Sequence, residues 1–205
     1  MRRAKQTQRR PQLTTPDLVL LSLLAERVMH GYQANLELER RCIRDWADIS
    51  RPQVYYSLEK LRRAGLIRAK RGKAPASGPE RRVFATTAKG RTALANALER
   101  EDWTTHRDRP AFLTWLALSW QARRGVIERQ FRCRKEFLEV EIARERRTLG
   151  AVLHETGHPY HEAVWMIRLT IAQFKLERRW LETVARELPK RARARHPRIV
   201  PKGLE

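Results

Sequence analysis

The sequence has little of what extracellular, metal-bound or membrane-spanning proteins depend on. Only two cysteines occur in 205 residues, and a disulfide scaffold or a zinc ribbon needs more of them at closer spacing. The longest apolar run, residues 18–25, is much too short to cross a bilayer. No apolar segment follows the charged start closely, as a secretory signal requires. We therefore expect a cytoplasmic protein with reduced cysteines, no cofactor, no bound metal and no membrane contact.

Acidic side chains are scarce relative to basic ones. The chain has 44 Lys and Arg against 23 Asp and Glu, which gives a formal net charge of +21. The excess is greatest in residues 51–91, which hold twelve basic side chains and only two carboxylates, Glu59 and Glu80. A general surplus of arginine can reflect the base composition of the coding DNA, but a local maximum cannot. Such a maximum is typical of a surface that binds phosphates.

The first half of the chain has the pattern of three helices, a hairpin and a fourth helix. Residues 1–12 are basic and polar, and we expect a disordered arm there. Helices are predicted over residues 17–29, apolar on nearly every side, and over residues 32–41. A strand at 66–71, a turn at 72–79, a return strand at 80–86 and a helix at 87–100 follow the third helix.

The third helix is predicted over residues 51–64 from its end signals. Ser50 and Gln53 have the spacing of a capping box, and Gly65 suits a helix C-terminus. Apolar residues recur on one side, and the opposite side is polar and basic. When such a helix lies beside a basic hairpin, the helix can enter the major groove of DNA while the hairpin contacts the adjacent phosphate backbone.

Three blocks of sequence carry a family resemblance. They are His30-Gly31-Tyr32-Gln33, then Tyr55, Leu58, Leu61 and Gly65-Leu66-Ile67, then Gly78 to Thr87 with Gly90. In this order and spacing the chain resembles the PadR family of bacterial regulators over residues 14–100. The resemblance implies a homodimeric repressor whose third helix and wing hold operator DNA. It places Tyr55 at the family's recognition-helix tyrosine and Arg81 and Arg82 in its basic wing.

The predicted DNA-binding side chains come from the polar side of the third helix and from the hairpin. Arginine can pair with guanine, and glutamine with adenine, through two hydrogen bonds in one plane, while most other contacts go to phosphates. The predicted set is Arg51, Gln53, Tyr55, Tyr56, Ser57, Lys60 and Arg63 on the helix, and Lys70, Arg71, Lys73, Arg81 and Arg82 on the hairpin.

The second half of the chain is predicted to be helical. One helical stretch covers residues 110–153, with a break near Gly125, and a last helix covers residues 160–188. The last helix has two apolar stripes, which indicate two neighbours, one of them in a partner chain. The stripes are Tyr160, Val164, Ile167, Ile171 and Phe174, and Trp165, Leu169, Ala172, Leu176, Trp180 and Val184.

The predicted fold is therefore mainly α-helical with a small β-hairpin wing. A winged helix-turn-helix DNA-binding domain occupies residues 13–100, and a C-terminal helical dimerisation domain occupies residues 108–188. A basic tail follows at 189–205. The predicted partners are double-stranded DNA and a second copy of the chain.

Three further interpretations remain at this point. Trp115, Trp120 and Trp165 either line a site for a flat aromatic effector or are core residues. His154-Glu155-Thr156-Gly157-His158 matches a zinc-protease pattern, but a helix is expected to end at the glycine, so we expect neither zinc nor enzymatic activity. The alternative function is an architectural protein that binds nucleic acid by charge without sequence preference.

Overall fold

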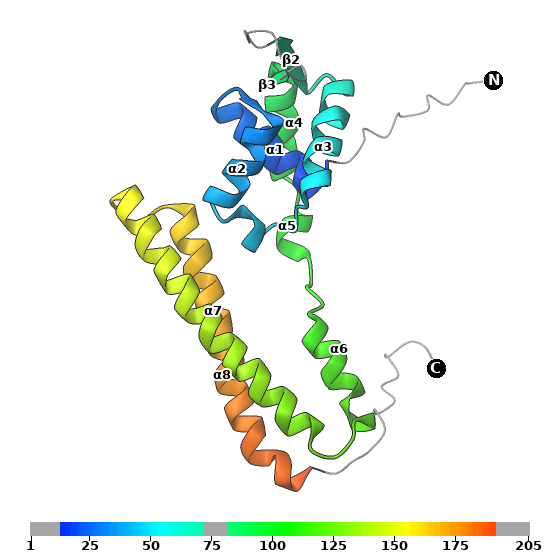
Figure 1. The fold of residues 1–205 in the computed structure, drawn as a ribbon, viewed down its shortest axis with the longest axis vertical. Coiled ribbons are helices and arrows are strands. Elements are labelled where there is room, and N and C mark those ends of the chain that lie inside the picture. Colours follow the sequence, from blue (N-terminus) through cyan, green and yellow to red (C-terminus); the bar gives the residue numbers. More distant parts are fainter. Residues whose placement is uncertain (1–12, 72–81, 192–205) are drawn as a thin grey trace, which may run out of the picture. The chain divides into compact units, whose positions relative to one another are not determined.

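The computed structural model describes residues 13–71 and 82–191. Its contacts divide the chain into two units, Met1–Arg107 and Asp108–Glu205, both drawn in Figure 1. The predicted fold class is confirmed, because the described residues are mainly helical and their strands form one small antiparallel sheet. The N-terminal unit contains α1 (Thr15–Glu26), β1 (Met29–His30), α2 (Gly31–Arg40), α3 (Arg51–Arg63), β2 (Ile67–Arg71), β3 (Arg82–Thr86), α4 (Ala88–Leu98), α5 (Asp102–Thr105) and a one-turn 3-10 helix at Ile43–Asp45.

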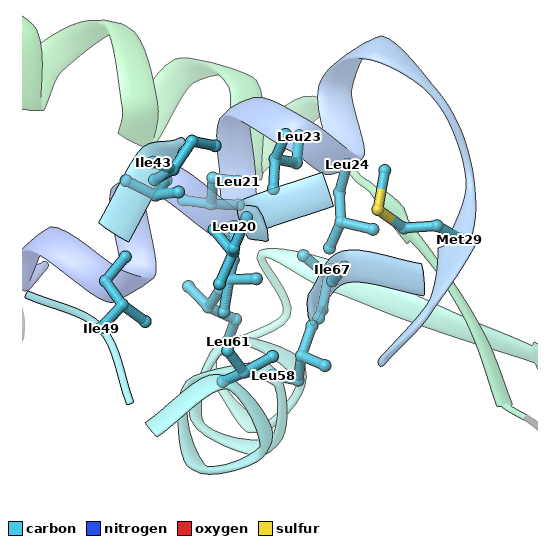
Figure 2. Packing of buried hydrophobic residues seen from close by; sticks show 14 of the residues in the cluster. Leu20, Leu21, Leu23, Leu24, Met29, Ile43, Ile49, Leu58, Leu61 and Ile67 are labelled. Carbon is cyan, nitrogen blue, oxygen red and sulfur yellow. The ribbon is translucent and has the colours of Figure 1, made fainter. Parts of the chain in front are cut away.

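Helix α1 lies at the centre of the N-terminal unit. It is apolar on nearly every side because α3, α4 and β3 all pack against it. Leu20 and Leu21 of α1 are completely buried, and Leu58 and Leu61 of α3 approach them from below in Figure 2. Burying a leucine side chain contributes about 1.5–3 kcal/mol to the stability of the folded state. This core therefore fixes the direction in which α3 presents its other sides.

The sheet has three strands in the order β1-β3-β2. Strands β2 and β3 form the predicted hairpin, with Arg71 opposite Arg82. The two-residue strand β1 was not predicted, because two residues are too few to show an alternating pattern. It pairs antiparallel with β3, placing Met29 opposite Phe84. Strand β1 thus joins the start of α2 to the hairpin.

A tight junction connects the end of α3 to the start of α4. The carbonyl oxygen of Leu66 accepts hydrogen bonds from the backbone nitrogen and the hydroxyl of Thr87, both at 3.0 Å. The Thr87 hydroxyl oxygen accepts one from the Gly90 nitrogen at 3.1 Å and caps α4. A Cβ at Gly90 would lie 2.1 Å from the Leu66 oxygen. The close approach of these two backbones therefore requires glycine at position 90.

The C-terminal unit is built around two long helices that lie side by side in Figure 1. It contains α6 (Ala111–Leu118), α7 (Val126–Thr156), α8 (Glu162–Glu187) and one-turn 3-10 helices at Ser119–Gln121 and Leu188–Lys190. Gly125 and Gly157 flank α7 with positive φ angles of 77° and 70°. Arg134 of α7 binds Glu177 of α8 through two hydrogen bonds of 2.7 and 2.8 Å.

The two apolar stripes of α8 have different surroundings. Val164, Ile167 and Ile171 of the first stripe are buried, as expected for the side that packs on α7. Tyr160 was wrongly included in that stripe, because it is exposed and precedes the helix. Most of the second stripe is uncovered in the single chain: Trp165, Leu169 and Leu176 are exposed, and Trp180 is partly exposed although its ring also contacts Phe112 and Phe131. Val184 was wrongly included in this stripe, because it packs against the core of the unit. The C-terminal unit therefore presents an apolar surface, which we call the α8 stripe.

Candidate nucleic-acid interface

The beginning of α3 has the predicted capping box. The Ser50 nitrogen donates to Gln53 Oε1 at 2.6 Å, and the Gln53 nitrogen donates to Ser50 Oγ at 3.4 Å. The side-chain oxygen of Gln53 is therefore already used by the backbone. Reading adenine with two hydrogen bonds needs both the oxygen and the NH2 group of a glutamine. While the capping box is closed, Gln53 has only its NH2 group for a base.

Five of the seven predicted α3 side chains face solvent. Tyr55 and Tyr56 retain 54% and 71% of their accessible surface, far more than aromatic residues of a core keep. Arg51, Gln53 and Arg63 are exposed as well. These five side chains form what we call the α3 front. It offers hydrogen-bond donors, two guanidinium groups and no carboxylate.

The predicted positions of Ser57 and Lys60 on this front are wrong. Ser57 is only 3% exposed, and Lys60 Nζ donates a hydrogen bond to Asp17 Oδ2, 43 residues earlier in α1. Asp17 is fully buried and also accepts hydrogen bonds from the nitrogen and hydroxyl of Thr14, at 2.8 and 2.9 Å. Ser57 and Lys60 therefore face α1, and they orient α3 rather than extend the α3 front.

The buried carboxylate of Asp17 stays ionised because of these neighbours. Burial by itself raises the pKa of Asp17, but hydrogen bonds from Lys60, Thr14 and Ser57 outweigh it, and the pKa lies below the ordinary value of 3.8. Asp17 and Lys60 thus form a charged link between α1 and α3.

Glu59 is the one carboxylate on α3, and two arginines neutralise it. Arg62 contacts it through two hydrogen bonds of 2.9 and 2.8 Å, and Arg63 through one of 2.8 Å. The hydrogen bonds from Arg62 and then Arg63 lower the pKa of Glu59 to about 2. The guanidinium of Arg63 remains largely exposed, so it can still approach a phosphate. This cluster leaves α3 without an uncompensated negative charge.

Only part of the predicted hairpin site can be placed. Arg82 is exposed at the start of β3, and its carbonyl oxygen lies 3.2 Å from His30 Nδ1. Lys73 and Arg81 lie outside the described residues, as do the side chains of Lys70 and Arg71. The contact with His30 nevertheless connects the hairpin base to the start of α2.

Tyr32 is a surface residue that the sequence interpretation missed. Its spacing from Leu36 resembled one apolar side of a helix, yet Tyr32 is 67% exposed. The preceding glycine explains the local geometry, because a Cβ at Gly31 would lie 3.0 Å from Cε1 of Tyr55. Helix α2 therefore begins directly against the Tyr55 ring. The tyrosine next to a glycine at the start of a helix was the signal that could have identified this corner.

Trp115 and Trp165, which were predicted to share an effector site with Trp120, are not brought together within one chain. Trp115 stacks on Phe112 at 5.6 Å and contacts Phe131 edge-on at 6.1 Å, in a cluster that also includes Trp180. Trp165 precedes Trp180 by 15 residues of α8, which corresponds to about 22 Å along a helix. Trp115 is thus partly buried against the core of the C-terminal unit, while Trp165 lies on the α8 stripe.

The zinc-protease pattern does not have the geometry that its chemistry needs. Helix α7 ends at Thr156, so His154 and His158 are not one turn apart in a helix. The Nδ1 atom of His158 instead accepts a hydrogen bond from the Tyr160 nitrogen at 3.2 Å. Among the described residues, no three His, Cys, Asp or Glu side chains gather closely enough to hold a metal ion.

The described helices also include none that is both long and apolar enough to cross a membrane.

Comparison with known proteins identifies relatives of the N-terminal unit. Residues 20–96 match the family described as Transcriptional regulator PadR-like family. This confirms the resemblance found in the sequence, and the match includes both α3 and the hairpin. A comparison with curated proteins found no match.

Solved structures of low sequence identity share the fold over most of this chain. Bacillus subtilis PadR in complex with operator DNA matches with a TM-score of 0.68 at 16% identity, over 86% of this chain and 98% of that one. Bacillus subtilis PadR in complex with p-coumaric acid gives a TM-score of 0.66 at 15% identity, over 86% and 96%. The Vibrio cholerae virulence activator AphA gives 0.61 at 21% identity, over 87% and 100%.

Proposed function

We propose that this chain, a PadR-like transcriptional regulator by its match over residues 20–96, represses transcription by binding an inverted-repeat operator as a homodimer. The observation that carries the proposal is the α3 front, a set of exposed hydrogen-bond donors without a free carboxylate. The ion pair of Lys60 with Asp17 links α3 to α1, and Tyr55 of the front and Arg82 of the hairpin border the same groove, where α2, α3 and β3 meet. A helix of this kind reads bases in the major groove while the hairpin contacts the neighbouring backbone. A related fold has been solved on operator DNA.

Dimerisation is proposed through the α8 stripe. One recognition helix covers only a few base pairs, whereas a two-fold dimer reads two half-sites about 34–36 Å apart or at multiples of that spacing. Trp165, Leu169, Leu176 and Trp180 are exposed along one side of α8. Contiguous apolar surface of this kind marks interaction sites in proteins. Packing α8 against α8 of the second chain would bury the α8 stripe of each chain.

Substituting glutamate for Leu169 and Leu176 together should convert the dimer to a monomer. Both leucines would lie at the centre of the proposed interface, where unpaired charges are costly to bury. Light scattering during size-exclusion chromatography should give the mass of two chains for the native protein and of one chain for the variant. Thr170→Glu, on the same helix but off the stripe, is the control and should remain dimeric. If the double variant remained dimeric, the dimer interface would have to lie elsewhere on the chain.

A small aromatic effector that releases the operator is also part of the proposal. It is supported by a related structure solved with p-coumaric acid and by the exposed position of Trp165. Since Trp115 is occupied by core contacts, a site at Trp165 would need the second chain to complete it.

The high charge favours one alternative, an architectural protein that binds any duplex. A net charge of +21 is enough for sequence-independent binding through phosphate contacts. Selection from a random duplex library separates the two functions. Enrichment of an inverted repeat supports the regulator, and the absence of any enriched sequence supports the alternative.

Two substitutions should weaken binding to the selected duplex in different ways. Arg82→Gln removes a phosphate contact, so affinity should fall equally on all sequences and the salt dependence should decrease by about one unit of slope. Gln53→Glu keeps the oxygen that caps α3 but removes the NH2 donors and adds a negative charge. It should therefore weaken binding to every duplex and, in addition, lose about 1–3 kcal/mol of discrimination at one base position.

Fluorescence anisotropy with the duplex and its single-base variants, at several salt concentrations, measures both effects. Arg147→Gln, an exposed change on α7, serves as the control and should bind like the native protein. The proposed interface is wrong if neither Arg82→Gln nor Gln53→Glu changes duplex binding.

A further inference from the structure

A small cleft of about 130 Å³ lies between the two long helices of the C-terminal unit. About four water molecules would fill it, at about 30 Å³ each, whereas drug-sized ligands need about 300–1,000 Å³. The cleft therefore has room for a small polyatomic ion but not for a larger molecule. Its walls come from both helices: Glu139, Ile142, Ala143 and Arg146 of α7, and Lys175 and Arg178 of α8.

Positive charge predominates in this cleft. Arg146 and Lys175 line it from opposite helices, and neither has an ion-pair partner in the part of the chain that the structure describes. Among the described side chains that line the cleft, Glu139 alone is acidic, and its Oε1 atom also lies 3.9 Å from Nζ of Lys135. The cleft thus has a surplus of positive charge that its own walls do not neutralise.

Arg178 brings a buried donor to the same cleft. Its Nε atom is buried and has no hydrogen-bond partner within the described residues. Oε1 of Glu182 lies 3.9 Å away, which is too far for a hydrogen bond, and it is closer to Nζ of Lys135, at 3.6 Å. Leaving a buried donor of a charged group without an acceptor is costly. An anion in the cleft would supply that acceptor.

Donors from two helices suit a tetrahedral oxyanion better than a carboxylate. A guanidinium group can bind two oxygens of one anion, and an ammonium group can bind another. A phosphate group offers three strong acceptor oxygens and about two negative charges at neutral pH. A carboxylate has only two oxygens and one charge. Three cations facing one carboxylate therefore favour phosphate.

We propose that this cleft binds a phosphate group, either inorganic phosphate or the phosphate of a small molecule whose remainder stays outside. Arg146 holds the group from α7, and Lys175 and Arg178 hold it from α8. Because the site exists only while the two helices are paired, bound phosphate stabilises the pair by mass action. No residue of the predicted DNA-binding set lines the cleft, so the proposal does not depend on the proposed function.

The nine lysines of the chain provide a direct test with inorganic phosphate as the probe. The full-length protein is labelled with 13C at lysine Cε, and each resonance is assigned by a Lys→Arg substitution. At constant ionic strength, the Lys175 resonance should shift along a saturation curve. That of Lys190, which is exposed in the same unit but does not line the cleft, should stay in place. An unchanged Lys175 resonance, or an unsaturated shift common to both lysines, would overturn the proposal.

Two variants that change the charge of the cleft in opposite directions test its walls, with Lys175 still as the reporter. Arg146→Gln should weaken phosphate at least about tenfold, because it removes a charged donor. Glu139→Gln should tighten it about threefold, because it removes a repelling carboxylate. Arg147→Gln and Glu155→Gln make the same charge changes at exposed positions outside the cleft and should stay within about twofold of the native protein. Equal effects in the cleft variants and their controls would contradict the proposed site.

Comparison of probes identifies the source of the phosphate group. Inorganic phosphate and glycerol 3-phosphate should both shift the Lys175 resonance, and the tighter of the two indicates a free ion or a phosphorylated molecule as the ligand. Acetate should bind at least about tenfold more weakly. A Lys175 shift with duplex DNA but not with phosphate would assign the cleft to nucleic acid and overturn the proposal.

Differential scanning calorimetry measures the stabilisation of the helix pair. In buffers of equal ionic strength, phosphate should raise the thermal midpoint of the native C-terminal unit more than that of Arg146→Gln. An equal rise in both proteins would mean that phosphate acts only through its general exclusion from protein surfaces, which would contradict binding in the cleft.

Discussion

Replacing Gly90 by alanine is expected to lower the thermal midpoint of the N-terminal unit by more than about 10 °C. The new Cβ would lie 2.1 Å from the carbonyl oxygen of Leu66 and 2.9 Å from Cγ2 of Thr86. The Leu66 oxygen cannot simply move, because it accepts two hydrogen bonds from Thr87. Overpacking typically costs 1–3 kcal/mol, and a clash with fixed backbone should cost about 3 kcal/mol or more. In a domain of this size, each kcal/mol shifts the midpoint by about 4–8 °C.

Differential scanning calorimetry measures this shift, and Gly150→Ala is the matched control. Gly150 is also a helical glycine, but a Cβ there would meet nothing within 4 Å. The alanine should raise the stability of the C-terminal unit by about 0.5–1 kcal/mol, because glycine is a poor helix former. If both alanine variants had the native midpoint, the close approach of α4 to the end of α3 would not exist in solution.

Lys60→Met should destabilise the N-terminal unit by about 3 kcal/mol, because it leaves the fully buried Asp17 without its cation. Chemical denaturation at pH 7 measures the loss. Arg63→Met, in the same helix, removes only an exposed partner of Glu59 and should cost less than about 0.5 kcal/mol. A Lys60→Met protein with native stability and weak DNA binding would instead support the original assignment of Lys60 to the α3 front.

The loss caused by Lys60→Met should also depend on pH. In the native protein the pKa of Asp17 is below its ordinary value, so its stabilisation is present above pH 4 and is lost as the pH falls through the folded pKa. Without Lys60, burial favours the protonated acid and the folded pKa rises. The free energy of unfolding of the variant is then lowered above the unfolded pKa of about 3.9, and this loss disappears below that pKa. The difference in stability between the two proteins should therefore shrink as the pH is lowered from 7 towards 4.

Features set by neighbouring residues could be predicted from the sequence. The capping box at Ser50 and Gln53 and the glycine at position 65 locate both ends of α3, since these signals act within a few residues. The two stripes of α8 were also separable by helical spacing alone. For the same reason, the family resemblance over residues 14–100 agrees with the match over 20–96.

Features set by distant residues could not be predicted. Ser57 and Lys60 are polar, and nothing near them in the sequence shows that a buried carboxylate lies opposite in α1. Tyr32 is one helical turn from Leu36, which is the spacing of core residues. Which side chains of α2 are exposed, however, depends on which of them α3 covers, and it leaves Tyr32 exposed. The groove at α2, α3 and β3 combines residues from position 30 to position 84. Such sites appear only once the three elements have been placed.

The pairing of β1 with β3 has a consequence for synthesis of the protein. Met29 pairs with Phe84, 55 residues later, and translation adds residues at about 5–20 per second, so the partner follows about 3–11 s later. Helices α2 and α3 are synthesised during that interval, while the strand that completes the sheet is still missing. Contacts so far apart in the sequence also slow folding. A ribosome that stalls between residues 64 and 82 would therefore hold a chain with a complete α3 but without the strand that joins β1 to the hairpin.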